Sequence, residues 1–202
     1  MTFAQRQRAA LIDLMAELGP FAPTMAGDWR VQDLAAHLYI REHRLDALPG
    51  IGLDRFAALT ERIQRDELHR RGFTGLLDEL RLPGWIMRPL DRLVNTSELF
   101  IHHEDVLRAN GRSQTLTAAE QQELWPIAKA LARRTQLAAG SRAILRRSDT
   151  GAEVAMGQGT RPVTVSGLPS ELLLHLSGRD ADVRLHGEPD AIGAWHNSIA
   201  AL

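Results

Sequence analysis

The stretch NTSELFIHHEDVLRAN, residues 95–110, places a carboxylate, an imidazole and a second carboxylate at spacings of four and three residues, namely Glu98, His102 and Asp105. On an α-helix, residues three and four positions apart are surface neighbours, and these side chains fall within roughly 60° of arc. A carboxylate and a histidine one helical turn apart can bind one metal ion from a single rigid element. The stretch therefore predicts a helix that carries part of a metal site.

A third ligand has to come from another helix, because catalytic zinc sites commonly use three protein ligands and leave a position for water or substrate. The helix predicted over about residues 30–45 offers His37, which lies between two leucines near the apolar edge of that helix. Glu42 and His43 lie more than about 120° round the same helix from His37, so they should point elsewhere. His37 is the best candidate for the third ligand.

Two aspartates are candidates for supporting roles. Asp105 could accept the second N–H of a ligating His102, which is the common arrangement around metal-bound imidazoles. Asp33 lies one turn before His37 and could do the same there, or it could be a favourable acid in the first turn of its helix. His103 lies about 100° round the helix from His102 and should face elsewhere. Alternatively, the face that carries Glu98, His102 and Asp105 forms a buried, hydrogen-bonded polar cluster that holds no metal.

The composition restricts the class of protein. A chain of 202 residues suits one medium domain or a domain plus a small appendage, and 44% apolar with 24% charged residues is ordinary for a globular protein. The net charge of −1 gives no field of one sign that would favour nucleic acid or an anionic membrane. No apolar run approaches the roughly 20 residues that span a bilayer. The N-terminus carries charges where a signal peptide needs its apolar stretch, so a cytoplasmic location is expected.

The sequence contains no cysteine. Disulfides, thiolate metal sites and a cysteine nucleophile are therefore excluded. A metal would have to be held by His, Asp and Glu, and any thiol chemistry would need an external thiol. Lys129 is the only lysine, so the positive charge is almost all arginine, which indicates GC-rich codon usage.

The first two thirds of the chain have helical periodicity. Helices are expected before Gly19, over about residues 30–45, and over about 89–109 with a stop at Asn110-Gly111. The segment 54–82 should hold one or two less regular helices, interrupted near Gly72.

A further helix should begin at a capping box that starts at Thr117, and should run to about residue 139 with a kink at Pro126. After Gly140, short strands alternate with two helices, and Asp149-Thr150-Gly151 is typical of a hairpin turn. This pattern indicates a small α+β domain. The predicted division is therefore a helical bundle over 1–139 and an α+β domain over 140–202.

Several of these motifs together resemble a known family. Trp29, the sequence DLAAHL at 33–38, the E-x-x-x-H-x-x-D pattern at 98–105 and GLPSELLLHLSGR at 167–179 are similar to the mycothiol-dependent maleylpyruvate isomerase group. That group lies within the DinB-like superfamily of metal-binding four-helix bundles. The resemblance extends over nearly the whole chain and is strongest to an actinobacterial branch of predicted metal-binding proteins. It implies a DinB-like four-helix bundle followed by a sterol-carrier-like α+β domain.

The resemblance also implies a function. A divalent metal, zinc in the first place, would be held by His37, Glu98 and His102, and would activate the thiol of mycothiol for isomerase or S-transferase chemistry on a small molecule. Arg179 matches the position of a functional arginine of the family and could clamp a carboxylate, or it could be an ordinary arginine near a helix end. Neither nucleic acid nor a membrane is an expected partner, and the protein would be a monomer or a homodimer.

Two other functions fit the same residues. A metal-dependent hydrolase would use metal-bound water as its nucleophile. A bundle that binds a metal or a small ligand would have no turnover.

Overall fold

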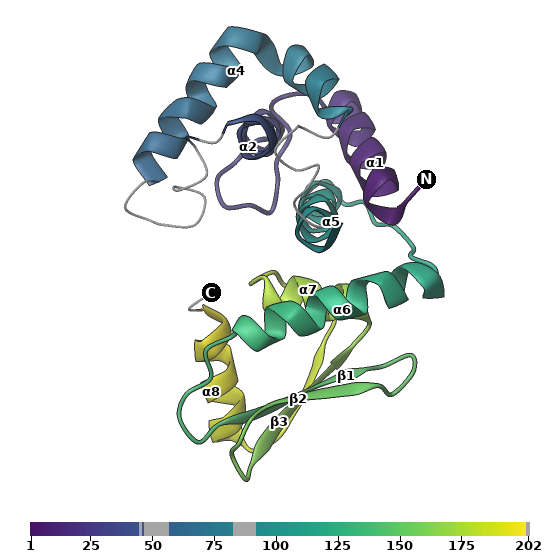
Figure 1. Ribbon diagram of the computed structural model, residues 1–202, viewed down its shortest axis with the longest axis vertical. Helices are drawn as coiled ribbons and strands as arrows, with labels where there is room; N and C mark the ends of the chain where they lie inside the picture. The colour runs from purple at the N-terminus through teal and green to yellow at the C-terminus, as the bar shows by residue number, and fades with distance from the viewer. Residues whose placement is uncertain (45, 47–56, 83–91, 201–202) are drawn as a thin grey trace. The chain divides into compact units, whose positions relative to one another are not determined.

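The computed structural model describes residues 1–44, 46, 57–82 and 92–200 of the chain. The chain divides into two compact units, Met1–Gln114 and Thr115–Leu202 (Figure 1). Within the described residues it forms seven α-helices and one four-stranded sheet, which confirms the prediction of a mainly helical protein with a small α+β part. None of the described helices is both long and apolar enough to cross a bilayer.

The first helix of the unit Met1–Gln114 is α1 (Phe3–Leu18), and it begins at a capping box. The Thr2 hydroxyl accepts from the Gln5 amide at 3.3 Å, and the Gln5 side chain accepts from the Thr2 amide at 2.8 Å. These contacts satisfy two of the backbone donors that a helix start leaves without partners. The helix ends at Gly19, whose φ of 83° favours glycine, as the sequence predicted.

The second helix, α2 (Val31–His43), is buried on most of its sides. Its seven buried apolar residues follow no narrow stripe, which is expected of a helix surrounded by protein rather than of a surface helix. These residues are Val31, Leu34, Ala35, Ala36, Leu38, Tyr39 and Ile40. The polar side chains of α2 are therefore held inside the unit, where they have to find partners.

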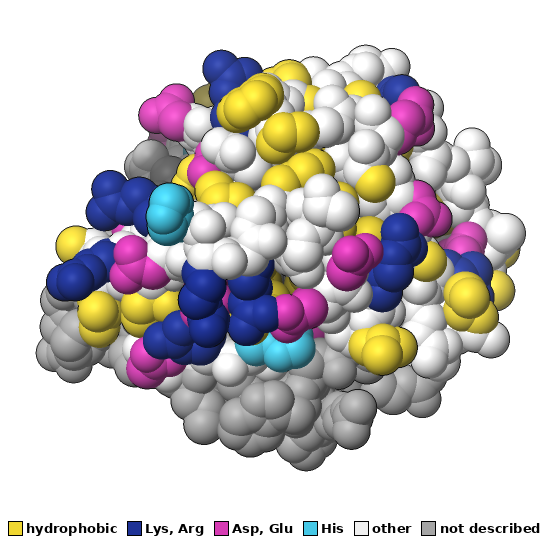
Figure 2. Space-filling model, turned by 90° about the horizontal axis from the view of Figure 1, so that it is seen from above, with side chains coloured by type: hydrophobic (Ala, Val, Ile, Leu, Met, Phe, Trp, Pro, Cys, Tyr) yellow, Lys and Arg dark blue, Asp and Glu magenta, His cyan; other side chains and the backbone are white. Residues whose placement is uncertain are grey.

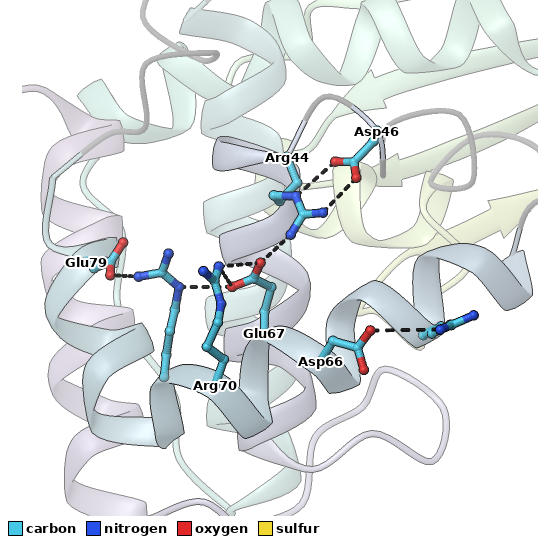
Figure 3. Close-up of polar contacts among 8 residues, drawn as sticks. Arg44, Asp46, Asp66, Glu67, Arg70 and Glu79 are labelled. Atoms are coloured by element: carbon cyan, nitrogen blue, oxygen red, sulfur yellow. Dashed lines mark hydrogen bonds and ion pairs between the residues drawn. The ribbon is translucent and has the colours of Figure 1, made fainter.

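The helix α4 (Ala57–Leu80) packs along α2, and an ion-pair cluster joins the two. Glu67 on α4 is buried and accepts from Arg44, which caps the C-terminal end of α2, as well as from Arg70 and Arg71 (Figure 3). Gly72, with a φ of 69°, kinks α4 at the point where the sequence predicted an interruption. Figure 2 shows one face of the molecule, on which acidic side chains lie beside basic ones, as in these pairs.

The helix α5 (Arg92–Ala109) carries Glu98, His102 and Asp105, and it packs against α1. Its predicted end is confirmed, because the Asn110 side chain donates to the Val106 carbonyl at 2.7 Å and Gly111 has a φ of 65°. The predicted start near residue 89 lies outside the described residues.

The unit Thr115–Leu202 begins with α6 (Ala118–Arg134). The predicted capping box is present, since Thr117 and Glu120 exchange hydrogen bonds of 2.8 and 3.3 Å. The helix ends at Arg134, five residues before the predicted end. It packs against α7 (Pro169–Leu176), where Gln121 and Ser170 exchange two hydrogen bonds of 3.0 Å.

This packing groups α6 with the C-terminal unit, whereas the division predicted from the sequence, 1–139 and 140–202, placed it with the N-terminal helices. The difference arises because helical periodicity marks a buried face but does not show which element will cover that face. A division by contacts gives Gln114 and Thr115 as the boundary.

The sheet of the C-terminal unit has the strand order β2-β1-β3-β4. The hairpin of β1 (Arg142–Arg147) and β2 (Glu153–Gly157) turns at the predicted residues, with Gly151 at a φ of 74°. β3 (Pro162–Gly167) runs parallel to β1, and β4 (Arg184–His186) runs antiparallel to β3. The inward residues of β1 and β3 alternate along each strand, and with α7 and α8 (Pro189–Ala200) they form a core that includes Ala143, Leu145, Val163, Val165, Leu172, Leu174 and Trp195.

Candidate metal centre

Two helices of the N-terminal unit bring together the three residues that the sequence proposed as ligands. His37 comes from α2, and Glu98 and His102 come from α5. One ligand atom from each of the three lies within 4.8 Å of the others, close enough to share a single ion. Within the described part of the chain, no other group of His, Asp and Glu side chains meets this geometry.

His102 is oriented by the aspartate one turn further along α5. Its Nδ1 lies 3.0 Å from Asp105 Oδ2, and Asp105 is buried. A carboxylate can only accept, so Nδ1 carries a proton in this pair, and in the neutral imidazole Nε2 keeps its lone pair. Nε2 faces Glu98, whose Oε2 lies 3.5 Å away. The arrangement is the one expected of a metal-binding histidine held by an outer carboxylate.

His37 is positioned by two aromatic rings. Its ring lies 4.9 Å from that of Trp29 and 5.6 Å from that of His102, measured between centroids. Trp29 is held in the loop before α2, where its carbonyl accepts from the Thr24 hydroxyl at 2.9 Å. The tryptophan that marked the family resemblance in the sequence therefore packs directly against a proposed ligand.

The electrostatic environment favours the ligand forms of two of the three residues. Burial, with smaller effects from His102 and Arg41, lowers the pKa of His37 to about 3, so this imidazole is neutral. Burial raises the pKa of Glu98, but interactions with His102 and Arg41 outweigh it and bring the value to about 2. A neutral imidazole and an ionised carboxylate are the forms that bind metals.

His102 differs from His37 in its protonation. Burial lowers the pKa of His102, but the carboxylates of Asp105 and Glu98 outweigh it, so the pKa lies above its ordinary value. A metal ion at Nε2 has to replace a proton there whenever the imidazole is protonated.

One neighbour of the three proposed ligands, Arg41, was not predicted from the sequence. It lies one turn after His37 on α2, it is buried, and its Nε stands 3.6 Å from Glu98 Oε2. The spacing of four residues from His37 was the available signal, since it puts both side chains on one face of the helix.

The acidic and imidazole side chains predicted to point elsewhere do so. Glu42 accepts from Arg8 at 2.5 and 3.1 Å, and the His43 ring stacks on Tyr39 at 4.6 Å. His103 donates from Nδ1 to the Gln7 side chain at 2.7 Å.

Asp33 takes the second of its two predicted roles. Its carboxylate accepts from the Arg30 amide at 2.9 Å and so satisfies a donor at the start of α2. Its backbone carbonyl accepts from the Gln64 side chain at 2.8 Å. These contacts make it a helix-start residue rather than a partner of His37.

Arg179 belongs to the C-terminal unit, just after α7. Its guanidinium donates to the Ser177 carbonyl at 2.7 Å, and the side chain is half-buried. This contact holds it near the helix end, and the catalytic role suggested by the resemblance stays a prediction.

The donor set fits a divalent transition metal. Two imidazole nitrogens and one carboxylate oxygen, with an outer carboxylate behind one imidazole, form a set that suits zinc and leaves a position for another ligand. The Glu98 side chain is 31% exposed, so solvent reaches the three ligands at Glu98.

Comparison with solved structures shows a likeness of the fold. No family profile and no curated protein sequence matches the chain. Among solved structures, a crystal structure of the mycothiol-dependent maleylpyruvate isomerase aligns with a TM-score of 0.54 over 92% of this chain and 91% of that chain, at 16% identity. The chain shares the fold of that isomerase. A histidine-to-alanine mutant of the same enzyme aligns with the same TM-score and coverage at 15% identity.

Proposed function

We propose that this protein is a metal-dependent enzyme that uses a low-molecular-weight thiol, as an isomerase or S-transferase, with zinc held by His37, Glu98 and His102. The observation that carries the proposal is the approach of these three side chains to within 4.8 Å of one another in a chain that has the fold of a mycothiol-dependent isomerase. We also propose that the helical part is a DinB-like four-helix bundle and that the C-terminal domain is sterol-carrier-like. The name of that isomerase supports mycothiol as the thiol.

The residues of the site have separable tasks. Asp105 fixes the tautomer of His102, so that Nε2 points toward Glu98 and His37. Trp29 restrains the His37 ring, and Arg41 lies beside Oε2 of Glu98, the same oxygen that faces His102. A divalent ion bound there would lower the pKa of a coordinated thiol and so supply a thiolate near neutral pH. The chain has no cysteine, so the thiol has to come from outside the protein.

Arg179 would serve the substrate rather than the metal. A guanidinium can bind a carboxylate through two parallel hydrogen bonds, which fixes both position and orientation. We propose that it clamps a carboxylate of the substrate during turnover.

The metal assignment is tested by measuring the metal content of purified, zinc-loaded protein. The Glu98→Ala, His102→Ala double variant should lose the bound metal. His69→Ala, which removes an exposed histidine of α4, should retain it as the matched control. Equal metal content in the double variant and the wild type would overturn the assignment.

The thiol requirement is tested by calorimetry with mycothiol on the metal-loaded protein, together with an assay of maleylpyruvate isomerisation. Binding that requires the metal, followed by turnover that requires the thiol, is the expected result. Hydrolysis of simple esters without thiol would replace the proposal with a metal-dependent hydrolase. Metal binding without thiol binding or turnover would leave a non-catalytic binding protein.

A further inference from the structure

The C-terminal unit contains a cavity of about 160 Å³ between the sheet and α8, and it shares no residue with the metal centre. Two almost completely buried side chains, Val163 of β3 and Trp195 of α8, give it an apolar floor. The Trp195 indole N–H donates to His175 Nε2 at 3.0 Å, which holds the ring in place. The cavity therefore offers a fixed apolar surface on which a small side chain can pack.

The backbone around this cavity is held by close contacts at two glycines. A Cβ atom at Gly159 would lie 2.0 Å from the carbonyl oxygen of Gly140, a lining residue, so only glycine fits there. A Cβ atom at Gly187 would lie 3.0 Å from the carbonyl oxygen of Pro162, at the start of β3. These contacts fix the turns that lead to the charged rim of the cavity.

Four charged side chains line the cavity, and the two signs come from different elements. Arg142 and Arg161 lie at the adjacent starts of β1 and β3, which pair in parallel with Arg142 opposite Pro162. Glu188 and Asp190 lie at the start of α8. All four are exposed, and none forms an ion pair or a side-chain hydrogen bond with another of the residues that the structure describes. Their charges are therefore available to a ligand.

The separation of the charges indicates the chemistry of that ligand. A carboxylate matches the N–H fork of an arginine, and an ammonium group donates to carboxylates. A ligand with only one of these groups would leave the opposite pair of side chains unused. The cavity is smaller than the roughly 300 Å³ at which pockets for drug-sized ligands begin, so the ligand has few atoms. A small zwitterion with an apolar side chain meets these requirements.

We propose that this cavity binds a free α-amino acid with an apolar side chain. Its carboxylate lies against Arg142 and Arg161, and its ammonium group faces Glu188 and Asp190. Its side chain packs on Trp195. Binding needs neither metal nor thiol, so the inference does not rest on the proposed function. The alternative is that the four charges form only a solvated rim.

The test is an NMR titration of the full-length protein with three probes. L-Leucine carries both charged groups, N-acetyl-L-leucine lacks the ammonium group, and L-leucinamide lacks the carboxylate. The indole N–H resonance of Trp195, assigned with a Trp195→Phe sample, reports on the cavity, and the three other tryptophans are internal references. The titration is run on zinc-loaded protein and repeated without metal, and the Trp195 shifts should be the same in both.

Two substitutions remove one charge from each side of the cavity. Arg161→Gln should weaken leucine and N-acetyl-leucine about tenfold and leave leucinamide unchanged. Glu188→Gln should weaken leucine and leucinamide about tenfold and leave N-acetyl-leucine unchanged. Arg184→Gln and Glu123→Gln change exposed residues of the same unit that do not line the cavity, so they are the matched controls and should bind all three probes as the wild type does.

In the wild type, leucine should bind at least about tenfold tighter than either truncated probe. No shift of Trp195 at about 10 mM leucine would overturn the inference, as would equal affinities for leucine and either truncated probe. An equal loss in the cavity variants and their controls would overturn it too. Shifts that require zinc would assign the binding to the metal centre, again against the inference. None of these outcomes changes the metal content or thiol binding by which the proposed function is tested.

Discussion

Two glutamates of the N-terminal unit, Glu67 on α4 and Glu98 on α5, both face arginines but differ in how much of their hydrogen-bonding capacity is used. The Glu67 side chain is 2% exposed and accepts four hydrogen bonds from three arginines (Figure 3). The Glu98 side chain is 31% exposed, and its contacts with His102 and Arg41 measure 3.5 and 3.6 Å. The first carboxylate has little capacity left for a ligand, while the second retains its capacity to accept.

The difference separates a structural ion pair from a candidate binding site more clearly than burial or charge does alone. Both glutamates are ionised, since the pKa of each lies below its ordinary value despite burial. At Glu67 the arginines supply the compensating charge in full. At Glu98 the contacts with His102 and Arg41 are longer, so the carboxylate keeps its capacity to bind a cation.

The largest effect expected from this comparison is on metal affinity in the Glu98→Gln variant. An amide is a much poorer ligand than a carboxylate, so the affinity for zinc should fall by more than the roughly hundredfold that loss of an outer partner can cause. The matched variant Glu67→Gln should leave zinc affinity unchanged. Competition with a chromophoric chelator measures the zinc affinity of both variants. An equal loss of affinity in the two would show that Glu98 is no more a metal ligand than Glu67.

Acid should weaken metal binding through His102 alone. Because the pKa of His102 is raised, a proton competes for Nε2 from a higher pH than at an ordinary histidine, so zinc affinity should fall as pH falls. The loss should approach about tenfold per pH unit, which corresponds to one proton. His37 adds no proton in this range, since its pKa is about 3. A slope that corresponds to two protons, measured by the same competition between pH 8 and 5, would contradict the assignment of His37 as neutral.

Most parts of the site that could be predicted from the sequence depend on a single helix. His37 is the exception, chosen for its place near the apolar edge of its own helix, and the structure brings it to Glu98 and His102. The orientation of His102 toward Glu98 and Asp105 follows from spacings of four and three residues, and the exclusion of His103 follows from the same geometry. The role of Asp33 was ambiguous, because a first-turn acid and an outer partner of a histidine have the same spacing, and only the contact with the Arg30 amide separates them.

Other features could not be predicted, because they depend on which elements meet. Arg41 is an unremarkable helical arginine until α2 and α5 are brought together with its Nε near Glu98. The placement of α6 in the C-terminal unit likewise depends on its packing against α7 through Gln121 and Ser170. The periodicity of apolar residues shows which face of a helix is buried. It does not show which other element covers that face, because this depends on the packing of the whole unit.

Removing the carboxylate of Glu67 should affect stability rather than metal binding. Three arginines would lose their shared partner, and breaking a buried ion pair typically costs about 3–5 kcal/mol. We expect about 2 kcal/mol for Glu67→Gln, because Arg70 and Arg44 can turn to solvent with exposures of 61% and 34%. Urea unfolding followed by circular dichroism measures the change, with the exposed Asp66→Asn of the same helix as control. A loss no larger than that of the control would mean that the cluster is not structural.

The smallest change is expected for Asp105→Asn, which alters the outer partner of His102 and leaves all three proposed ligands in place. The amide oxygen can still accept from Nδ1, so the orientation of the ring should survive, but the negative charge that makes the imidazole a stronger ligand is lost. Zinc affinity should fall about tenfold, at the lower end of the range for such partners. Loss of the carboxylate should also lower the pKa of His102, so the decline of zinc affinity should begin at a lower pH than in the wild type. The exposed Asp13→Asn should change neither quantity, and an Asp105 variant that behaves like it would show that the negative charge of Asp105 does not strengthen the imidazole as a ligand.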